Sequence, residues 1–307
     1  MKIDVFKNGG ATFVPPVLLS LRDFYRKMVA LGQILFVVSA AKNITRLLSH
    51  IVFVFFSEDK KHNGRYAKYF KQDLIETLLE KFYSKHIQLI TSIFLSTDLK
   101  KATNDFRQIF SELKVCISLL NEGDNIDKVY PLVLKYGELA SSSIFAHFLR
   151  SLGIQTELLD VRKYLTTTSV YEGASLLKLD NSFLAPLSNT EAAVVQGFIG
   201  LNKEGEDTNL GYDGSDLSAA YFLGGVIDAG AISSLTYWKD VNKFYLEDPF
   251  NNPNAKSFYK MPFSQYEKLP SFPIRLDAVR YAISKGVNVN MGYLSNPNGR
   301  KAVIYPD

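Results

Sequence analysis

The chain has 307 residues, of which 47% are hydrophobic and 21% charged, and its formal net charge is +4. This length allows one large domain or two small ones around a sizeable core. The small net charge and the scattered lysines give no argument for nucleic acid. Cys116 is the only cysteine, which excludes a disulfide within one chain and a cysteine-built metal site.

The longest apolar runs of the sequence are 33–41 and 51–57. Both are far shorter than the roughly 18 residues that a membrane span requires, and the N-terminal MKIDVFKNGG has no apolar signal core. The four histidines show no metal-ligand spacing. We therefore expect a cytoplasmic protein with no membrane partner, no nucleic-acid partner and no histidine-held metal.

Hydrophobic patterning predicts strands that alternate with helices along the chain. In chain order it predicts strand 2–6, helix 17–31, strand 31–40, a mostly helical region 43–150 that includes helices 73–94 and 138–153, strands 154–161 and 192–200, helix 217–229, strand 233–238, helix 275–286 and strand 287–294. This alternation predicts an α/β fold with a mostly parallel central sheet sandwiched between helices, in three layers.

Two glycine-containing turns follow predicted strands. One is KNGG at 7–10, and the other is GYDGSD at 211–216, just before a predicted helix. A phosphate could be cradled by backbone N–H groups where such a turn opens a helix, although Gly, Asp and Ser are also common in ordinary loops. Because ligands gather at the carboxyl ends of parallel strands, the two turns could meet at one site.

Five segments, in this order, carry a resemblance to a known family: KNGGATF, VVSAAKNITRLL, YGELASSSIFAHFLRSLGIQTELLDVR, VVQGFIGLNKEGEDTNLGYDGSDLSAAYFLGGVIDA and YWKDVNKFYLEDP. They resemble the motifs of the aspartokinase branch of the amino acid kinase family. The resemblance implies one amino acid kinase domain over 1–307, with an acid-substrate lobe at 1–200 and a nucleotide-binding lobe at 201–307. It also implies a catalytic domain only, without the paired regulatory domains of many aspartokinases.

The activity implied by the resemblance is ATP-dependent phosphorylation of the side-chain carboxylate of aspartate. Lys7 and Asp216 would be catalytic: Lys7 would reach the β and γ phosphates, and Asp216 would orient the lysine and assist Mg²⁺. The phosphate and nucleotide contacts would come from Gly9, Gly10, Gly214, Ser215, Trp238, Lys239, Asp240, Tyr245 and Asp248. The amino acid substrate would bind Ser39, Thr45, Glu138 and Tyr212, with Glu138 suited to an α-ammonium. ATP and Mg²⁺ are the implied cofactors, and a homodimer stays open.

The sequence departs from the family pattern at three places. Where aspartokinases usually have Gly-Arg-Gly-Gly-Ser-Asp, this chain has Tyr212 and Asp213 in place of the arginine and the following glycine. That arginine would hold a substrate carboxylate in a bidentate grip. Phe250 replaces a phosphate-facing arginine, and the segment 271–278 lacks the family's lysine, with Arg275 the nearest cation.

Three functions therefore stay open: an aspartate kinase, a kinase of the same superfamily with another acceptor, and a homologue that binds a ligand or partner without catalysis. Simpler readings of single residues also stay open. Lys7 could be a solvated charge, Glu138 an exposed residue at a helix start, and Trp238 and Tyr245 plain core aromatics.

Overall fold

The computed structural model describes residues 2–57, 65–247, 251–252 and 254–307. An eight-stranded sheet forms its centre, in the order β12-β14-β13-β9-β1-β2-β6-β3. Strands β13, β9, β1, β2, β6 and β3 pair in parallel, whereas β14 runs antiparallel to β13. Their bounds are β1 Ile3–Asn8, β2 Gln33–Val38, β3 Thr156–Leu159, β6 Ala192–Gln196, β9 Leu235–Lys239, β12 Lys260–Pro262, β13 Val289–Tyr293 and β14 Ala302–Tyr305.

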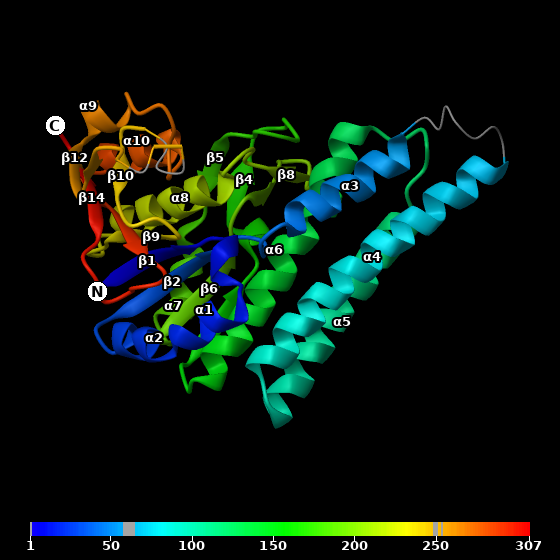
Figure 1. Ribbon diagram of the computed structural model, residues 1–307, viewed down its shortest axis with the longest axis horizontal. Helices are drawn as coiled ribbons and strands as arrows, with labels where there is room; N and C mark the ends of the chain where they lie inside the picture. The colour runs from blue at the N-terminus through cyan, green and yellow to red at the C-terminus, as the bar shows by residue number, and fades with distance from the viewer. Residues whose placement is uncertain (1, 58–64, 248–250, 253) are drawn as a thin grey trace.

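Helices cover both faces of this sheet (Figure 1). On one face lie α1 Pro15–Ser20, α2 Arg22–Val29, α3 Ile44–Phe56, α4 Arg65–Ile93, α5 Ser96–Ser118 and α6 Ile126–Ser151. On the other face lie α7 Leu184–Leu187, α8 Gly214–Asp228, α9 Phe263–Tyr266 and α10 Leu276–Ser284. The predicted fold class, a mostly parallel sheet between two helical layers, is confirmed.

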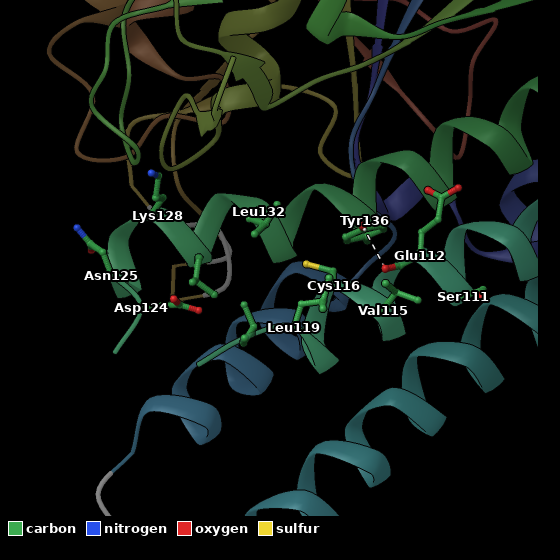
Figure 2. A pocket seen from close by; sticks show the side chains of 12 residues that line it. Ser111, Glu112, Val115, Cys116, Leu119, Asp124, Asn125, Lys128, Leu132 and Tyr136 are labelled. Atoms are coloured by element: carbon green, nitrogen blue, oxygen red, sulfur yellow. Dashed lines mark hydrogen bonds between the residues drawn. The ribbon is translucent and has the colours of Figure 1, made fainter. Parts of the chain in front are cut away.

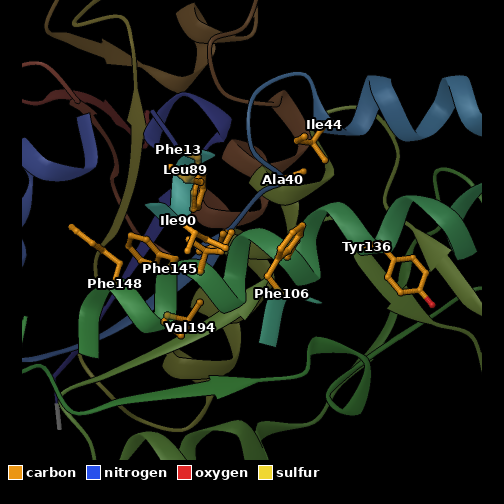
Figure 3. Close-up of a cluster of buried hydrophobic side chains, with 14 of the residues drawn as sticks. Phe13, Ala40, Ile44, Leu89, Ile90, Phe106, Tyr136, Phe145, Phe148 and Val194 are labelled. Carbon is orange, nitrogen blue, oxygen red and sulfur yellow. The ribbon is translucent and has the colours of Figure 1, made fainter. Parts of the chain in front are cut away.

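Strict alternation along the central strands creates the two layers of core. In β1, Phe6 faces the cluster under α1–α6, whereas Ile3 and Val5 face the cluster under α8 and α10. The same alternation in β2 sends Phe36 to the first face and Val37 to the second. Figure 3 shows part of the first cluster, in which Phe145 packs against both Phe13 and Phe148, with Ala40 and Ile44 further along the cluster. A strand buried on both faces is typical of a parallel sheet.

A smaller four-stranded sheet, in the order β5-β4-β7-β8, extends the molecule beside the carboxyl ends of the central strands (Figure 1). Its strands are β4 Leu165–Thr167, β5 Leu176–Leu179, β7 Ile199–Leu201 and β8 Asp207–Asn209. A two-stranded ribbon joins β10 Phe244–Tyr245 to β11 Ser257–Phe258. In the described part of the chain, no helix is both long and apolar enough to cross a membrane.

Several predicted elements differ from the observed ones, and the helices predicted at 73–94 and 138–153 begin earlier, at Arg65 and Ile126. Helix 17–31 is two helices, because the chain turns at Leu21, whose N–H contacts the carbonyls of both Val17 and Leu18. Strand 192–200 is divided into β6 and β7 at Phe198, which has a left-handed φ of 71°. Helix 217–229 begins three residues earlier than predicted, at Gly214. Strand 287–294 is followed by a further strand, β14, which the pattern did not indicate.

Candidate active site

The carboxyl ends of three adjacent parallel strands bring polar side chains to one edge of the central sheet. Lys7 lies near the end of β1, Ser39 follows β2, and Lys239 ends β9. The strand register places Lys7 between Val37 of β2 and Tyr237 of β9. This is the edge at which open α/β sheets bind their ligands.

Asp216, in the first turn of α8, is the centre of a buried ionic cluster. Its carboxylate lies 2.9 Å from Lys7 Nζ and 3.0 Å from Lys239 Nζ, and it accepts a hydrogen bond of 3.2 Å from the backbone N–H of Arg275. The Tyr237 hydroxyl donates to the backbone carbonyl of Asp216 at 2.9 Å. Residues from β1, β9 and α8, far apart in the sequence, are thus fixed around one carboxylate.

Electrostatics keep that carboxylate ionised. Burial alone would raise the pKa of Asp216, but attraction to Lys239 and Lys7, with their hydrogen bonds, lowers it to about 2. Burial lowers the pKa of Lys7, and the adjacent Asp216 offsets part of that effect. Lys7 is therefore a buried, partnered cation and not the solvated strand-end charge that the sequence left open.

The turn before α8 presents the start of the helix to the same place. Asp213 precedes the first helical residue in a left-handed conformation, with φ of 51°. Gly214 and Ser215 follow it and are buried, whereas the Tyr212 side chain is 90% exposed. The N–H groups and the positive end of the dipole of this 15-residue helix favour an anion here.

Glu138 reaches the site because α6 approaches the 40–48 segment closely at Gly137. A Cβ on Gly137 would lie 3.0 Å from the Cβ of Ala40 and 3.1 Å from Ile44 Cγ2. The adjacent Glu138 is only 2% exposed, and its Oε1 accepts a hydrogen bond of 3.4 Å from the Ala40 N–H. Burial raises the pKa of Glu138 to about 8, against the lowering effects of the Ala40 N–H and Lys7. It is not the exposed helix residue of the simpler reading.

These groups surround a cavity of about 300 Å³. The structure brings together seven of the predicted site residues in its lining: Lys7, Ser39, Thr45, Glu138, Tyr212, Gly214 and Ser215. The sequence did not predict the other six lining residues as site residues: Tyr130, Leu134, Glu172, Phe198, Gly211 and Asp213. Asp213 was noted only as a departure from the family pattern.

The predicted glycines of the first turn lie beside this cavity. Gly9 and Gly10 follow β1, and Thr12 and Phe13 donate backbone hydrogen bonds to their carbonyls. A Cβ on Gly10 would lie 2.9 Å from the carbonyl oxygen of Ala40, so this close approach of two turns requires a glycine.

The other predicted nucleotide residues are spread along the segment after β9. The Trp238 ring is buried and packs edge-on against Phe6 and Phe24, as a core aromatic would. Asp240 is exposed, and the Tyr245 hydroxyl donates to Asn242 at 3.3 Å. Asp248, and Phe250 with it, lie outside the described residues. The nucleotide roles of these four predicted residues stay predictions.

Arg275, which the sequence could not place, belongs to the α8 turn. Its guanidinium donates to the carbonyls of Leu210 at 2.5 Å and Tyr212 at 3.0 Å, in addition to its backbone contact with Asp216. It holds the turn in place and does not line the cavity.

The described residues contain no group of three or more His, Cys, Asp or Glu side chains arranged to hold a metal ion. Asp216 is already contacted by two ammonium groups, which leaves it little capacity as a metal ligand. This donor set suits a Mg²⁺ ion that would be held mainly by the phosphates of a nucleotide, because Mg²⁺ keeps several of its waters and needs few protein ligands beside substrate phosphates. Such an ion would neutralise phosphate charge.

A second cavity, of about 640 Å³, lies between α5 and α6 (Figure 2). Its lining is mainly apolar and includes Val115, Leu119 and Leu132. Lys128, its only Lys or Arg side chain, is paired with Glu206 at 2.5 Å. It is the larger cavity, but the ionic cluster and the start of α8 belong to the smaller one.

The fold and this site define an α/β protein with a buried ionic cluster where strands end and a helix begins. The family model described as "Amino acid kinase family" matches residues 2–291. The chain therefore belongs to the amino acid kinase family.

Several aspartokinases are similar to it. Lysine-sensitive aspartokinase 3 of Escherichia coli is 31% identical over 145 residues, which are 46% of this chain and 31% of that enzyme. Aspartokinase 1 of Bacillus subtilis is 34% identical over 127 residues, 41% of this chain and 30% of that enzyme. The matched segments thus span about a third of these relatives.

Solved aspartokinase structures share the fold. The structure of E. coli aspartokinase III in complex with aspartate and ADP superimposes with a TM-score of 0.77 at 20% identity, covering 99% of this chain and 65% of that one. Its complex with lysine and aspartate gives a TM-score of 0.79 at 19% identity, with the same coverage.

Proposed function

We propose that this chain transfers the γ-phosphoryl group of ATP to a carboxylate of a small amino acid. Aspartate is the reference acceptor, and its side-chain carboxylate would become 4-phospho-aspartate. The observation that carries the proposal is the buried Lys7–Asp216–Lys239 cluster, which lies where β1 and β9 end and α8 begins, beside a cavity of substrate size. Family membership and the similarity to aspartokinases support it.

In this proposal the protein positions the reactants and stabilises charge. One carboxylate oxygen of the acceptor attacks the γ-phosphorus, and the bond from that phosphorus to the β,γ-bridging oxygen breaks, leaving an acyl phosphate and ADP. The Lys7 ammonium stabilises the charge on the transferred group, and Asp216, which Lys239 also contacts, holds Lys7 in place. Gly214 and Ser215 line the phosphate side of the cavity, and the Ser215 N–H is the donor there, because the Gly214 N–H already donates to the Gly211 carbonyl at 2.9 Å. Glu138 accepts from the acceptor's ammonium.

A second candidate, the same reaction on another acceptor, is favoured by one observation: a tyrosine and an aspartate, Tyr212 and Asp213, form the rim of the cavity. The third candidate, a ligand-binding homologue without catalysis, is the one that the next experiment addresses. A homodimer and the two-lobe division at residue 200 stay predictions.

The test compares the wild type with Lys7→Ala. We expect millimolar ATP with Mg²⁺ to raise the melting temperature of the wild type, because a ligand that binds only the folded state stabilises it. In an ADP-release assay, Lys7→Ala should lower kcat by a factor of about 10² or more and leave the acceptor KM nearly unchanged. Absence of both the thermal shift and ADP release in the wild type would favour the non-catalytic reading.

A further inference from the structure

The cavity is more acidic than a site for a dicarboxylate should be. Among its described lining residues there is one Lys or Arg side chain, Lys7, and there are three carboxyl side chains: Glu138 in the interior, and Glu172 and Asp213, which are exposed. Any acceptor in this site therefore meets more carboxyl groups than cations on the protein.

The cations nearby are already engaged. The Lys7 and Lys239 ammonium groups both contact Asp216. The Arg275 guanidinium donates to the carbonyls at the α8 turn and lies 3.5 Å from Asp277. Lys42 lines a different pocket, together with Phe13 and Lys85. Within the described chain, Lys7 is thus the one cation in position to face an acceptor's reacting carboxylate, and a second carboxylate would have no cation to pair with.

Glu138 indicates which group the acceptor carries besides its reacting carboxylate. Its Oε2 is buried and has no hydrogen-bond partner among the described residues, although the side chain lines the cavity. A buried carboxylate oxygen without a donor is costly, and an ammonium group on the ligand supplies both the donor and the opposite charge. The cavity therefore fits one carboxylate near Lys7 and one ammonium near Glu138.

We propose that the preferred acceptor is an amino acid with one free carboxylate, such as a β-amino acid or an aspartyl unit whose α-carboxyl group is an amide. Its only free carboxylate is phosphorylated, Glu138 binds its ammonium, and Asp213 at the rim repels acceptors that carry a second carboxylate. The inference rests on the proposed function and names the substrate class of the same site. The balance is that of the reaction above: the carboxylate and ATP give an acyl phosphate and ADP, with no proton or electron exchanged.

Four small acids separate the two charges. β-Alanine is aspartate without its α-carboxylate, succinate is aspartate without its ammonium, and propionate lacks both. Binding of each acid to the protein with Mg²⁺ and a non-hydrolysable ATP analogue is measured by NMR-detected titration, and turnover with ATP is measured as ADP release and hydroxylamine-trapped acyl phosphate. We expect β-alanine to bind at least tenfold more tightly than aspartate, and propionate at least tenfold more weakly than β-alanine.

Three variants assign these preferences to residues. Glu138→Gln should bring the dissociation constants of β-alanine and propionate to within threefold of each other. Asp213→Asn keeps a residue that tolerates the left-handed conformation at φ of 51°, and it should narrow the gap between β-alanine and aspartate at least threefold. The double variant Tyr212→Arg with Asp213→Gly should make aspartate the better ligand of the two.

Equal or tighter binding of aspartate than of β-alanine by the wild type would overturn the inference. So would an unchanged ammonium preference in a Glu138→Gln protein with a native circular dichroism spectrum. The proposed function fails separately: tight β-alanine binding with no acyl phosphate from any of the four acids would refute phosphoryl transfer and leave the ligand class supported.

Discussion

Two buried carboxylates beside the same cavity differ in how many hydrogen-bond and charge partners the fold gives them. Asp216 receives two ammonium groups and a backbone N–H, and its pKa is lowered to about 2 although burial opposes this. Glu138 receives one long hydrogen bond from a backbone N–H, and burial raises its pKa to about 8. The first carboxylate is complete without a ligand, whereas the second lacks a donor. The difference separates the part of the site that is preorganised from the part that a ligand completes.

The largest effect is expected from breaking the complete cluster at its centre. Asp216→Asn keeps the shape of the side chain and removes the charge that balances Lys7 and Lys239. Leaving a buried pair uncompensated costs roughly 3–5 kcal/mol of folding free energy, and misplacing the catalytic cation should lower kcat by a factor of about 10³. Urea denaturation and ADP-release kinetics measure the two effects.

Asp213→Asn is the matched control, because Asp213 lies three residues earlier on the same turn and is exposed. It should leave the free energy of unfolding within about 0.5 kcal/mol of the wild type, as surface substitutions usually do. Equal destabilisation by the two substitutions would mean that the Asp216 cluster has no special structural role.

The sequence predicted the Asp216 cluster better than the surroundings of Glu138. Lys7 and Asp216 stand in short glycine-containing motifs, and such local patterns can be identified without knowing the fold. The contact of Lys239 with Asp216 and the role of Arg275 depend on how β9 and the segment before α10 pack against α8. Nothing near either residue in the sequence indicates that packing.

The cavity-lining residues that the sequence did not predict also depend on how distant segments pack together. Phe198 reaches the cavity because the chain turns there with a left-handed φ of 71°, which divides one predicted strand into two. Glu172 is brought to the rim by a bridge between its backbone and Asn209. Trp238 shows the converse: it stands in a nucleotide-type motif, and strand alternation in β9 turns its ring into the core, so its nucleotide role stays a prediction.

A second prediction concerns Glu138 and the change of the free energy of unfolding with pH. A glutamate titrates near 4.5 when the chain is unfolded and at about 8 in the folded state, so between these values the folded state binds more protons. The free energy of unfolding should therefore fall as the pH rises from about 4.5 to 8 and level off above that. Glu138→Gln removes this loss, and it should be more stable than the wild type at pH 9 by up to about 5 kcal/mol.

Urea denaturation of both proteins at pH 5, 7 and 9 measures this difference. At pH 5 the two should be nearly equal, because a protonated glutamic acid and a glutamine differ little in charge and shape. A stability difference that does not change with pH would show that Glu138 is not titrating in the folded protein. Millimolar β-alanine should reduce the difference at pH 9, because the ammonium stabilises the ionised carboxylate.

The smallest effect on activity is expected at Lys239, which distinguishes the two lysines of the complete cluster. Lys239→Met leaves Asp216 in contact with Lys7 and the Arg275 N–H, so kcat should fall less than tenfold, well below the loss in Lys7→Ala.

The effect of Lys239→Met on the free energy of unfolding should appear at acid pH. Lys239 is the strongest of the influences that lower the pKa of Asp216, so its loss moves that pKa up from about 2 toward the ordinary value of 3.8. The stabilisation from the ionised carboxylate is present above pH 3.8 and is lost as the pH falls through the folded-state pKa, so the variant should begin to lose it at a higher pH than the wild type. Acid titration followed by circular dichroism gives both midpoints. Coincident midpoints would mean that Lys239 does not set the pKa of Asp216. A loss of kcat as large as that of Lys7→Ala would mean that Lys239 serves the phosphate as well as Lys7.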